Sequence, residues 1–132
     1  MTGVQTCALP IYGIPALCDT GIVVVGVNTI NLGPVAVNDN GFITNEDTPL
    51  NGDVSTNDSD PNGDLLTFSL QNNAANGNVV MNLNGTFSYT PNLNFNGTDS
   101  FTYLVCDNGA PSLCDSATVN ITVNPEIGRA HV

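Results

Sequence analysis

Hydrophobic and polar residues alternate in short runs along this chain, and clusters of Asn, Gly, Asp and Pro separate the runs. Alternation with a period of two is typical of half-buried β-strands, and no helical period is present. The predicted strands are 35–37 with 42–44, 49–54, 65–70, 79–83, 86–90, 100–105 and 117–123. Seven short strands in about 100 residues predict an all-β fold, a seven-stranded Greek-key β-sandwich.

Local signals refine this prediction. Asn84-Gly85 predicts a β-hairpin turn, because both residues tolerate a positive φ. We expect the aromatic residues at strand ends to pack in the core rather than to form a ligand platform, and Tyr103 to tie a strand crossing through its hydroxyl. These aromatic residues are Tyr89, Phe95, Phe101 and Tyr103.

The chain contains an internal repeat. Residues 15–20 (PALCDT) recur 96 residues later as 111–116 (PSLCDS), and the register holds through 27–28 and 123–124. A constant offset of this kind predicts tandem domains. We therefore expect 12–31 to be the last strand of a preceding repeat plus a linker, and 32–125 to be one complete repeat.

Both termini resemble the translation of a short-read sequencing adapter. The matching segments are 1–11 and 126–132, one adapter strand at each end. We expect neither to belong to the native fold. Arg129 and His131 lie in the second segment and Cys7 in the first, so residues 12–125 contain no Lys, Arg or His.

Charge and composition exclude several function classes. The chain has 12 Asp and Glu against one Lys or Arg, and its formal net charge is −11. It lacks the cations that would neutralise phosphates, so we expect no nucleic-acid partner. The sequence contains no run of 18 apolar residues, so we expect no membrane insertion. Without a His or a Lys in 12–125, Ser-His, Cys-His and Schiff-base catalysis have no candidates. Two-carboxylate glycoside hydrolysis stays open in principle, but the acids cluster in turns with calcium-like spacing and the chain has no Trp as a sugar platform, so we expect no enzyme activity.

One acidic loop has the spacing of a calcium ligand set. Asp58, Asp60, Asn62 and Asp64 form the pattern D-x-D-x-N-G-D, and Gly63 permits a sharp turn. This matches the first half of an EF-hand loop, but Ser69 stands at the twelfth position, where an EF-hand has a bidentate Glu. The alternative is a polar turn that merely connects two strands.

A further acid must then come from elsewhere in the chain. The candidates are Glu46, Asp47, Asp99 and Asp107. Asp39, in Asn38-Asp39-Asn40 just after the linker, is a candidate for a calcium site between repeats. Because acids without bases repel one another, the charge balance favours a bound cation such as Ca²⁺.

Two cysteines bracket a short loop. Cys106 and Cys114 flank residues 107–113 between two predicted strands, so the ends of a hairpin would face each other. We expect a disulfide there and, with it, an oxidising compartment. Metal binding by two cysteines alone is the weaker alternative. Cys18 stands 96 residues before Cys114, so its own partner would lie at position 10, inside the adapter-like segment.

The strings PVAVNDN, NEDTPLNGDV, NDSDPNGDLLTFSL and NGTFSYTPNLNFNGTDSFTYLV, followed by ATVNITV, resemble a known family. They are similar to the bacterial cadherin-like, Ig-like repeats of large secreted and cell-surface proteins, over residues 34–124. The resemblance implies a sandwich fold, calcium binding and a role in adhesion or surface display. Under it we expect no glycans at the sequons that begin at Asn57, Asn84, Asn96 and Asn120.

Two functions remain open at this stage. The first is a calcium-binding structural or adhesive spacer repeat of a secreted or surface protein, whose partners are neighbouring repeats and a cell-surface protein or glycan. The alternative is a carbohydrate- or ligand-binding module attached to a secreted enzyme. Neighbouring sequence would discriminate between them, because many similar repeats favour the spacer and an adjacent hydrolase favours the module.

Overall fold

The computed structural model describes residues 21–127. The chain divides into two units, the first ending at Ile30 and the second beginning at Asn31. In the first unit, residues 21–30 are extended and form no strand, and their apolar side chains are exposed. The adapter-like segment 1–11, Cys7 and Cys18 lie outside the described residues. The described part of the chain contains no helix long and apolar enough to cross a bilayer.

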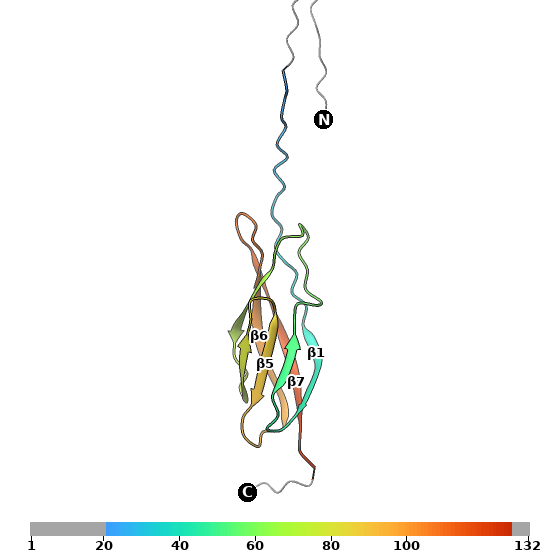
Figure 1. Ribbon diagram of the computed structural model, residues 1–132, viewed down its shortest axis with the longest axis vertical. Coiled ribbons are helices and arrows are strands. Elements are labelled where there is room, and N and C mark those ends of the chain that lie inside the picture. The colour runs from blue at the N-terminus through green and yellow to red at the C-terminus, as the bar shows by residue number, and fades with distance from the viewer. Residues whose placement is uncertain (1–20, 128–132) are drawn as a thin grey trace, which may run out of the picture. The chain divides into compact units, whose positions relative to one another are not determined.

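The second unit is a sandwich of two β-sheets (Figure 1). One sheet has the strand order β1-β7-β6-β3 and the other β2-β5-β4. The strands are β1 (Asp39–Asn45), β2 (Leu50–Asp53), β3 (Thr67–Asn72), β4 (Gly77–Met81), β5 (Thr86–Pro91), β6 (Gly97–Cys106) and β7 (Cys114–Asn124). The predicted seven-stranded all-β sandwich is confirmed.

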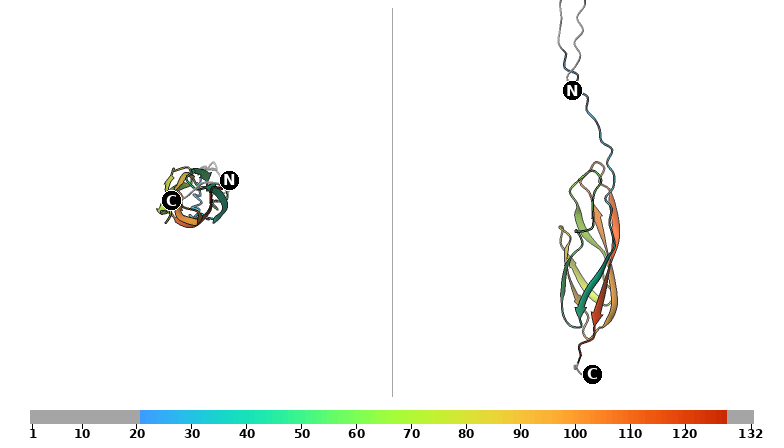
Figure 2. Two further views of the ribbon diagram at one scale, coloured as in Figure 1. Left: turned by 90° about the horizontal axis from the view of Figure 1, so that it is seen from below. Right: turned by 90° about the vertical axis from the view of Figure 1, so that its right-hand side faces the viewer.

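Strand direction decides which loops meet at each end of the sandwich. β1 pairs with β7 in parallel, and β6 pairs with β7 in antiparallel fashion from Gly97↔Val123 to Cys106↔Cys114. The end of β6 and the start of β7 therefore lie at one end, the ends of β1 and β7 and the start of β6 lie at the other, and β1 begins opposite the middle of β7. The strands run lengthwise along the sandwich in both side views, and the end-on view shows a narrow cross-section (Figures 1 and 2).

The core follows the period of two that the sequence shows. Alternate residues of β5, β6 and β7 point inward, and the rings of Phe87 and Phe101 meet edge to face with centroids 5.1 Å apart. The buried hydrophobic residues are Val54, Phe68, Val79, Phe87, Tyr89, Phe101, Tyr103, Val105, Ala117, Val119, Ile121 and Val123. Phe95 is partly buried against this cluster. The aromatic residues at strand ends thus belong to the core, as predicted.

One local prediction is wrong and one is confirmed. The first strand begins at Asp39, and Val35 forms only an isolated bridge with Ser59, because the amides of Ala36 and Val37 donate to carboxylates instead of to a neighbouring strand. The hairpin turn at Asn84-Gly85 is confirmed, because β4 and β5 pair antiparallel on either side of it and the Gly85 amide donates to the Asn82 carbonyl oxygen at 3.0 Å. Gly85 is the residue of this turn with a positive φ, at 93°.

Candidate metal centre

The acidic loop between β2 and β3 folds around the side chain of Asp60. Its Oδ1 accepts hydrogen bonds from the backbone amides of Asn62 at 2.8 Å and Asp64 at 3.1 Å. Gly63, with a φ of 78°, makes the sharp turn, and its amide donates to the Asp60 carbonyl oxygen. Asp and Gly at these positions are the residues that such a turn requires, so the local sequence accounts for the shape of the loop.

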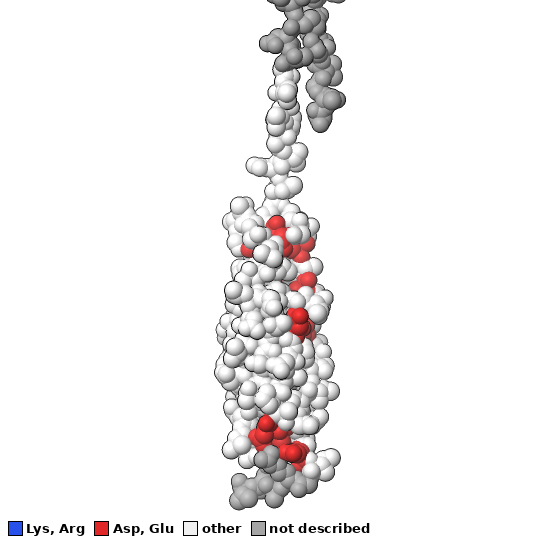
Figure 3. Space-filling view, in the orientation of Figure 1, with Lys and Arg blue, Asp and Glu red and all other residues white. Residues whose placement is uncertain are grey.

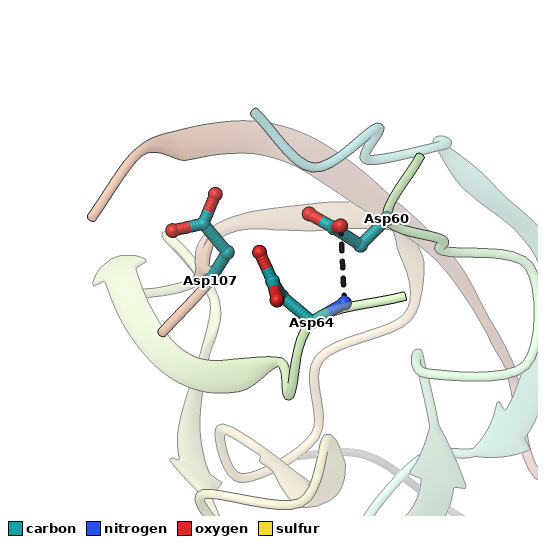
Figure 4. A group of neighbouring side chains, drawn as sticks. All are labelled: Asp60, Asp64 and Asp107. Atoms are coloured by element: carbon teal, nitrogen blue, oxygen red, sulfur yellow. Dashed lines mark hydrogen bonds between the residues drawn. The ribbon is translucent and has the colours of Figure 1, made fainter. Parts of the chain in front are cut away.

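Three carboxylates converge beside this loop. Asp60, Asp64 and Asp107 each place one oxygen within 4.8 Å of the others, and Figure 4 shows the three side chains facing a common space. Asp107 comes from the end of β6 and is only 5% exposed. Asp60 Oδ2 is buried and has no hydrogen-bond partner. A buried carboxylate oxygen without a donor is costly, and a cation would remove that cost.

Asp107 is held by the loop that follows it. Its Oδ1 accepts hydrogen bonds from the backbone amides of Leu113 at 2.8 Å and Gly109 at 3.1 Å. Its own amide donates to the Leu113 carbonyl oxygen, and the Ser112 hydroxyl donates to the Asp107 carbonyl oxygen. Burial opposes ionisation, but the hydrogen bonds from Leu113, Asn31 and Gly109 hold the pKa of Asp107 below its ordinary value.

A disulfide between Cys106 and Cys114 closes this loop. This is the pair that the sequence analysis selects, and it is the last matched pair of the β6–β7 ladder. Asp107 directly follows the first cysteine, so the cross-link lies one residue from a carboxylate of the cluster.

Asn31 brings the start of the domain to the same place, which the sequence analysis did not foresee. Its Nδ2 donates to Asp107 Oδ2 at 3.0 Å and to the Pro111 carbonyl oxygen at 2.7 Å. Its Oδ1 is buried and has no hydrogen-bond partner. An Asn three residues before a Pro was the only sequence signal, and it is too common in this Asn-rich chain to single out a ligand.

Two other residues of the loop motif have different contacts. Asp58 accepts hydrogen bonds from the Val37 amide at 2.7 Å and from the Tyr103 hydroxyl at 2.8 Å. Asn62 Oδ1 accepts a hydrogen bond from the Leu32 amide. Both residues thus fasten the segment before β1 to the loop, while Asp60 and Asp64 face Asp107.

The Tyr103 hydroxyl ties three segments together. It has one hydrogen but lies near three acceptors: Asp58 Oδ2, Asp39 Oδ2 at 3.1 Å and the Val37 carbonyl oxygen at 3.2 Å. Burial raises the pKa of both carboxyl groups, and the hydrogen bonds to them only partly oppose this rise. Asp39 therefore lies in a buried contact with the core tyrosine.

The remaining acidic candidates lie at the other end of the sandwich. Glu46 and Asp47 follow β1, and Asp99 lies near the start of β6, so strand direction separates them from Asp107. Eight residues of β-strand between Asp99 and Asp107 span roughly 27 Å. Figure 3 shows acidic side chains at both ends of the sandwich. We call the end of the sandwich that holds Asp60, Asp64 and Asp107 the metal end, and the end that holds Glu46, Asp47 and Asp99 the glutamate end.

The chemistry of the metal end fits a hard cation. Ca²⁺ takes six to eight oxygen ligands, and two oxygens that each lie about 2.4 Å from one ion are at most about 4.8 Å apart. The three carboxylates meet this limit. Asn31 contacts this cluster through its Nδ2, and its Oδ1 is a further buried oxygen, a neutral amide oxygen, without a hydrogen-bond partner. Residues 21–127 contain no Lys, Arg or His, so no side chain of the described part supplies a positive charge here.

Comparisons with known proteins agree with the architecture. A nucleoside hydrolase-related hypothetical protein from Saccharophagus degradans, associated with carbohydrate metabolism, is similar with a TM-score of 0.50 and 22% identity, over 71% of this chain and 26% of that chain. An endo-fucoidan hydrolase from glycoside hydrolase family 107 is similar with a TM-score of 0.54 and 20% identity, over 76% of this chain and 15% of that chain. At these identities the likeness shows the fold alone.

The chain thus spans about a quarter or less of the length of these structures. A search of curated proteins finds no match. The family model of the bacterial Ig domain matches residues 31–122, which is the sandwich described above and more than half of the chain. On this match, with its two-sheet fold, the chain belongs to the bacterial Ig domain family.

Proposed function

We propose that this domain binds one Ca²⁺ ion at its metal end and serves as a calcium-stiffened spacer in a secreted or surface protein. The observation that carries the proposal is the convergence of Asp60, Asp64 and Asp107, in which one buried Asp60 oxygen has no donor. Carboxylates in such proximity repel one another, and a divalent cation would turn that repulsion into attraction.

The proposed stiffening of the domain follows from the positions of the ligands along the chain. Asp60 and Asp64 lie in the β2–β3 loop, Asp107 follows β6, and Asn31 stands at the start of the domain. An ion shared by these segments would join three parts of the chain that are far apart in sequence. Extracellular calcium modules bind with dissociation constants of order 10⁻⁴ to 10⁻³ M, which suits a site that is filled outside the cell.

The spacer role rests on the repeat. The 96-residue offset between 15–28 and 111–124 indicates a neighbouring domain of the same kind, as in cadherin-like tandem arrays. Domains in series transmit orientation from one to the next, so stiff repeats hold a distal binding domain away from its anchor. Neighbouring repeats are the first expected partners, and we place the adhesion target outside this domain.

An extracellular location agrees with two features. Bacterial Ig domains and disulfides both favour an oxidising compartment, and this chain combines them. Residues 21–127 contain neither His nor Lys, which leaves Ser-His, Cys-His and Schiff-base catalysis without candidates, and the carboxylates that a glycosidase would need as a separated pair converge instead in the cluster of Asp60, Asp64 and Asp107. We therefore propose a non-catalytic domain.

Carbohydrate binding is the competing function, and the similar structures include carbohydrate-active proteins. Sugar sites commonly use exposed aromatic rings, but each Phe and Tyr among residues 21–127 is buried or half-buried. The surface of the described domain therefore supports the spacer better. Binding of the isolated protein to a glycan array would reverse this preference.

Calorimetric titration of the whole chain with Ca²⁺ tests the proposal. We expect one site with a dissociation constant near 10⁻⁴ to 10⁻³ M, and its loss in Asp60→Asn and Asp64→Asn. Asp47→Asn is the matched control, because it removes one charge at the glutamate end and keeps the oxygen that accepts from the Asn94 amide. Absence of calcium binding by the unaltered chain would overturn the proposal.

A further inference from the structure

The disulfide lies against the metal end. Cys106 and Cys114 stand eight positions apart in the chain, and Asp107 is the first residue of the loop that their disulfide closes. The carboxylate that completes the acidic cluster therefore stands one residue from the cross-link.

Most of the contacts that orient Asp107 come from within the closed loop. Leu113 and Gly109 donate backbone amides to its Oδ1, and Ser112 donates its hydroxyl to its carbonyl oxygen. Asn31 supplies the one side-chain contact from outside the loop. The direction of the Asp107 carboxylate thus depends on residues 109–113 keeping their places.

Besides the cross-link, three hydrogen bonds hold this loop: the Asp107 amide donates to the Leu113 carbonyl oxygen, Asn31 Nδ2 to the Pro111 carbonyl oxygen, and the Leu65 amide to Asn108 Oδ1. Asn108, Ala110, Pro111 and Ser112 are exposed, so the loop has little packing against the core. Beyond Cys106↔Cys114 the β6–β7 ladder makes no further matched pair. Opening the disulfide would free the ends of the loop and let the amides of Gly109 and Leu113 move away from Asp107.

We propose that the Cys106–Cys114 disulfide positions Asp107 for calcium and so sets the affinity of the site, which is higher in the oxidised protein than in the reduced one. This inference rests on the proposed calcium function. Reduction by an external dithiol transfers two electrons and two protons to the cystine, giving two thiols while the dithiol becomes a cyclic disulfide. Groups that orient a metal ligand without touching the metal commonly change affinity by about tenfold or more.

The coupling is reciprocal. If the oxidised protein binds Ca²⁺ more tightly, then Ca²⁺ must make the disulfide harder to reduce by the same factor. For a two-electron couple, a tenfold difference in affinity corresponds to a shift of about 30 mV toward more negative potential.

The test measures the calcium dissociation constant of the full chain before and after reduction, with Cys7 and Cys18 replaced by Ser so that Cys106 and Cys114 are the cysteines that remain. We expect roughly tenfold weaker binding after reduction and in the double variant Cys106→Ser/Cys114→Ser. A redox titration with and without saturating Ca²⁺ should show the corresponding shift in midpoint potential. Circular dichroism reports whether the sandwich stays folded.

Val79→Ala is the control for stability. Val79 is buried in the other sheet, so its truncation destabilises the domain without touching the loop, and its calcium affinity should equal that of the parent chain. If the disulfide-free chain unfolds, Ser112→Ala decides, because it removes one contact to Asp107 and leaves the cross-link. We expect its affinity to fall by about threefold.

The two proposals fail in different ways. Absence of calcium binding by the oxidised chain overturns the calcium function itself. Equal affinities of the oxidised and reduced chains, or an unchanged affinity in Ser112→Ala when the reduced chain unfolds, overturn the positioning role and leave the calcium function standing.

Discussion

The two ends of the sandwich each hold three of the candidate carboxylates, but the donors around them differ. At the glutamate end, Asp99 Oδ2 accepts hydrogen bonds from the Tyr89 hydroxyl at 2.8 Å and the Asn76 amide at 3.1 Å. Asp47 accepts from the Asn94 amide, and Glu46 accepts at 2.6 Å from the amide of Glu126, the first residue of the adapter-like segment. Asp47 and Asp99 thus act as hydrogen-bond acceptors that fasten loops.

At the metal end the carboxylates face one another. Asp60 uses one oxygen to shape its loop and leaves the other buried without a donor. The difference shows that the number of acids does not identify a cation site. What distinguishes the metal end is that three carboxylates bring oxygens within 4.8 Å of one another, so that their mutual repulsion favours an ion between them.

The largest expected effect comes from the glutamate end. Asp99→Ala should lower the free energy of unfolding by about 3 kcal/mol, because the buried Tyr89 hydroxyl and the Asn76 amide would lose their acceptor. Denaturant unfolding measures this loss, which should be the same with and without Ca²⁺. Asp99→Asn keeps an oxygen acceptor and should lose less. A calcium-dependent loss would remove the distinction between the two ends.

Opening the disulfide should have the next largest effect. The loop-closure entropy of so short a loop predicts a loss of roughly 2–3 kcal/mol in Cys106→Ser/Cys114→Ser. For a domain near 100 residues this is a fall in Tm of roughly 10–20 °C in EDTA. Mass spectrometry of non-reduced peptides should find the two cysteines linked. Free alkylation of both without reductant would contradict the disulfide and weaken the extracellular assignment.

Asp60→Asn tests the metal end directly. In EDTA it should leave Tm unchanged or slightly raised, because its oxygen still shapes the loop and one repulsive charge is gone. In Ca²⁺ at ten times the dissociation constant, the parent chain should gain about 1.4 kcal/mol, a rise of roughly 5–10 °C, which the variant lacks. Mg²⁺ should substitute poorly, because it gives up its water reluctantly. A calcium shift that survives Asp60→Asn would place the ion elsewhere.

The smallest expected effect concerns Asp39. Burial raises its pKa in the folded protein above 3.8, so its contribution to stability is full below that pH and is lost as the pH rises through the folded pKa. Asp39→Asn should therefore raise Tm by a few degrees at pH 7 without calcium and flatten the pH dependence above 3.8. The new side-chain amide at position 39 would also donate a hydrogen bond to the Tyr103 hydroxyl oxygen, which in the parent chain lies near three acceptors.

The pKa shift of Asp107 has the opposite sign to that of Asp39, so Asp107 serves as the comparison. Its pKa is lowered, so its contribution is present above 3.8 and is lost as the pH falls through the folded value. Thermal melts of the calcium-free chain between pH 3 and 7 should separate the two behaviours. An Asp39→Asn variant with the same pH profile as the parent chain would contradict the assignment.

Much of the fold was predictable from local sequence. Alternation located the seven strands, and Asn, Gly, Asp and Pro marked the turns, because side-chain direction in a strand and backbone freedom in a turn are local properties. The error occurred where pairing between strands decides the structure. Val35 has the residue type of a strand but finds only one bridge partner, Ser59.

The candidate site divides in the same way. The sequence by itself determined the turn around Asp60 and Asp64, the absence of a neutralising base and the pairing of two cysteines at the ends of one hairpin, since each depends on residues near one another in the chain. The tertiary structure alone selected Asp107 from four acids, turned Asp58 toward Tyr103 and brought in Asn31. Strand direction and register determine these contacts, and they arise from packing between residues that lie from about 45 to more than 75 positions apart in the chain.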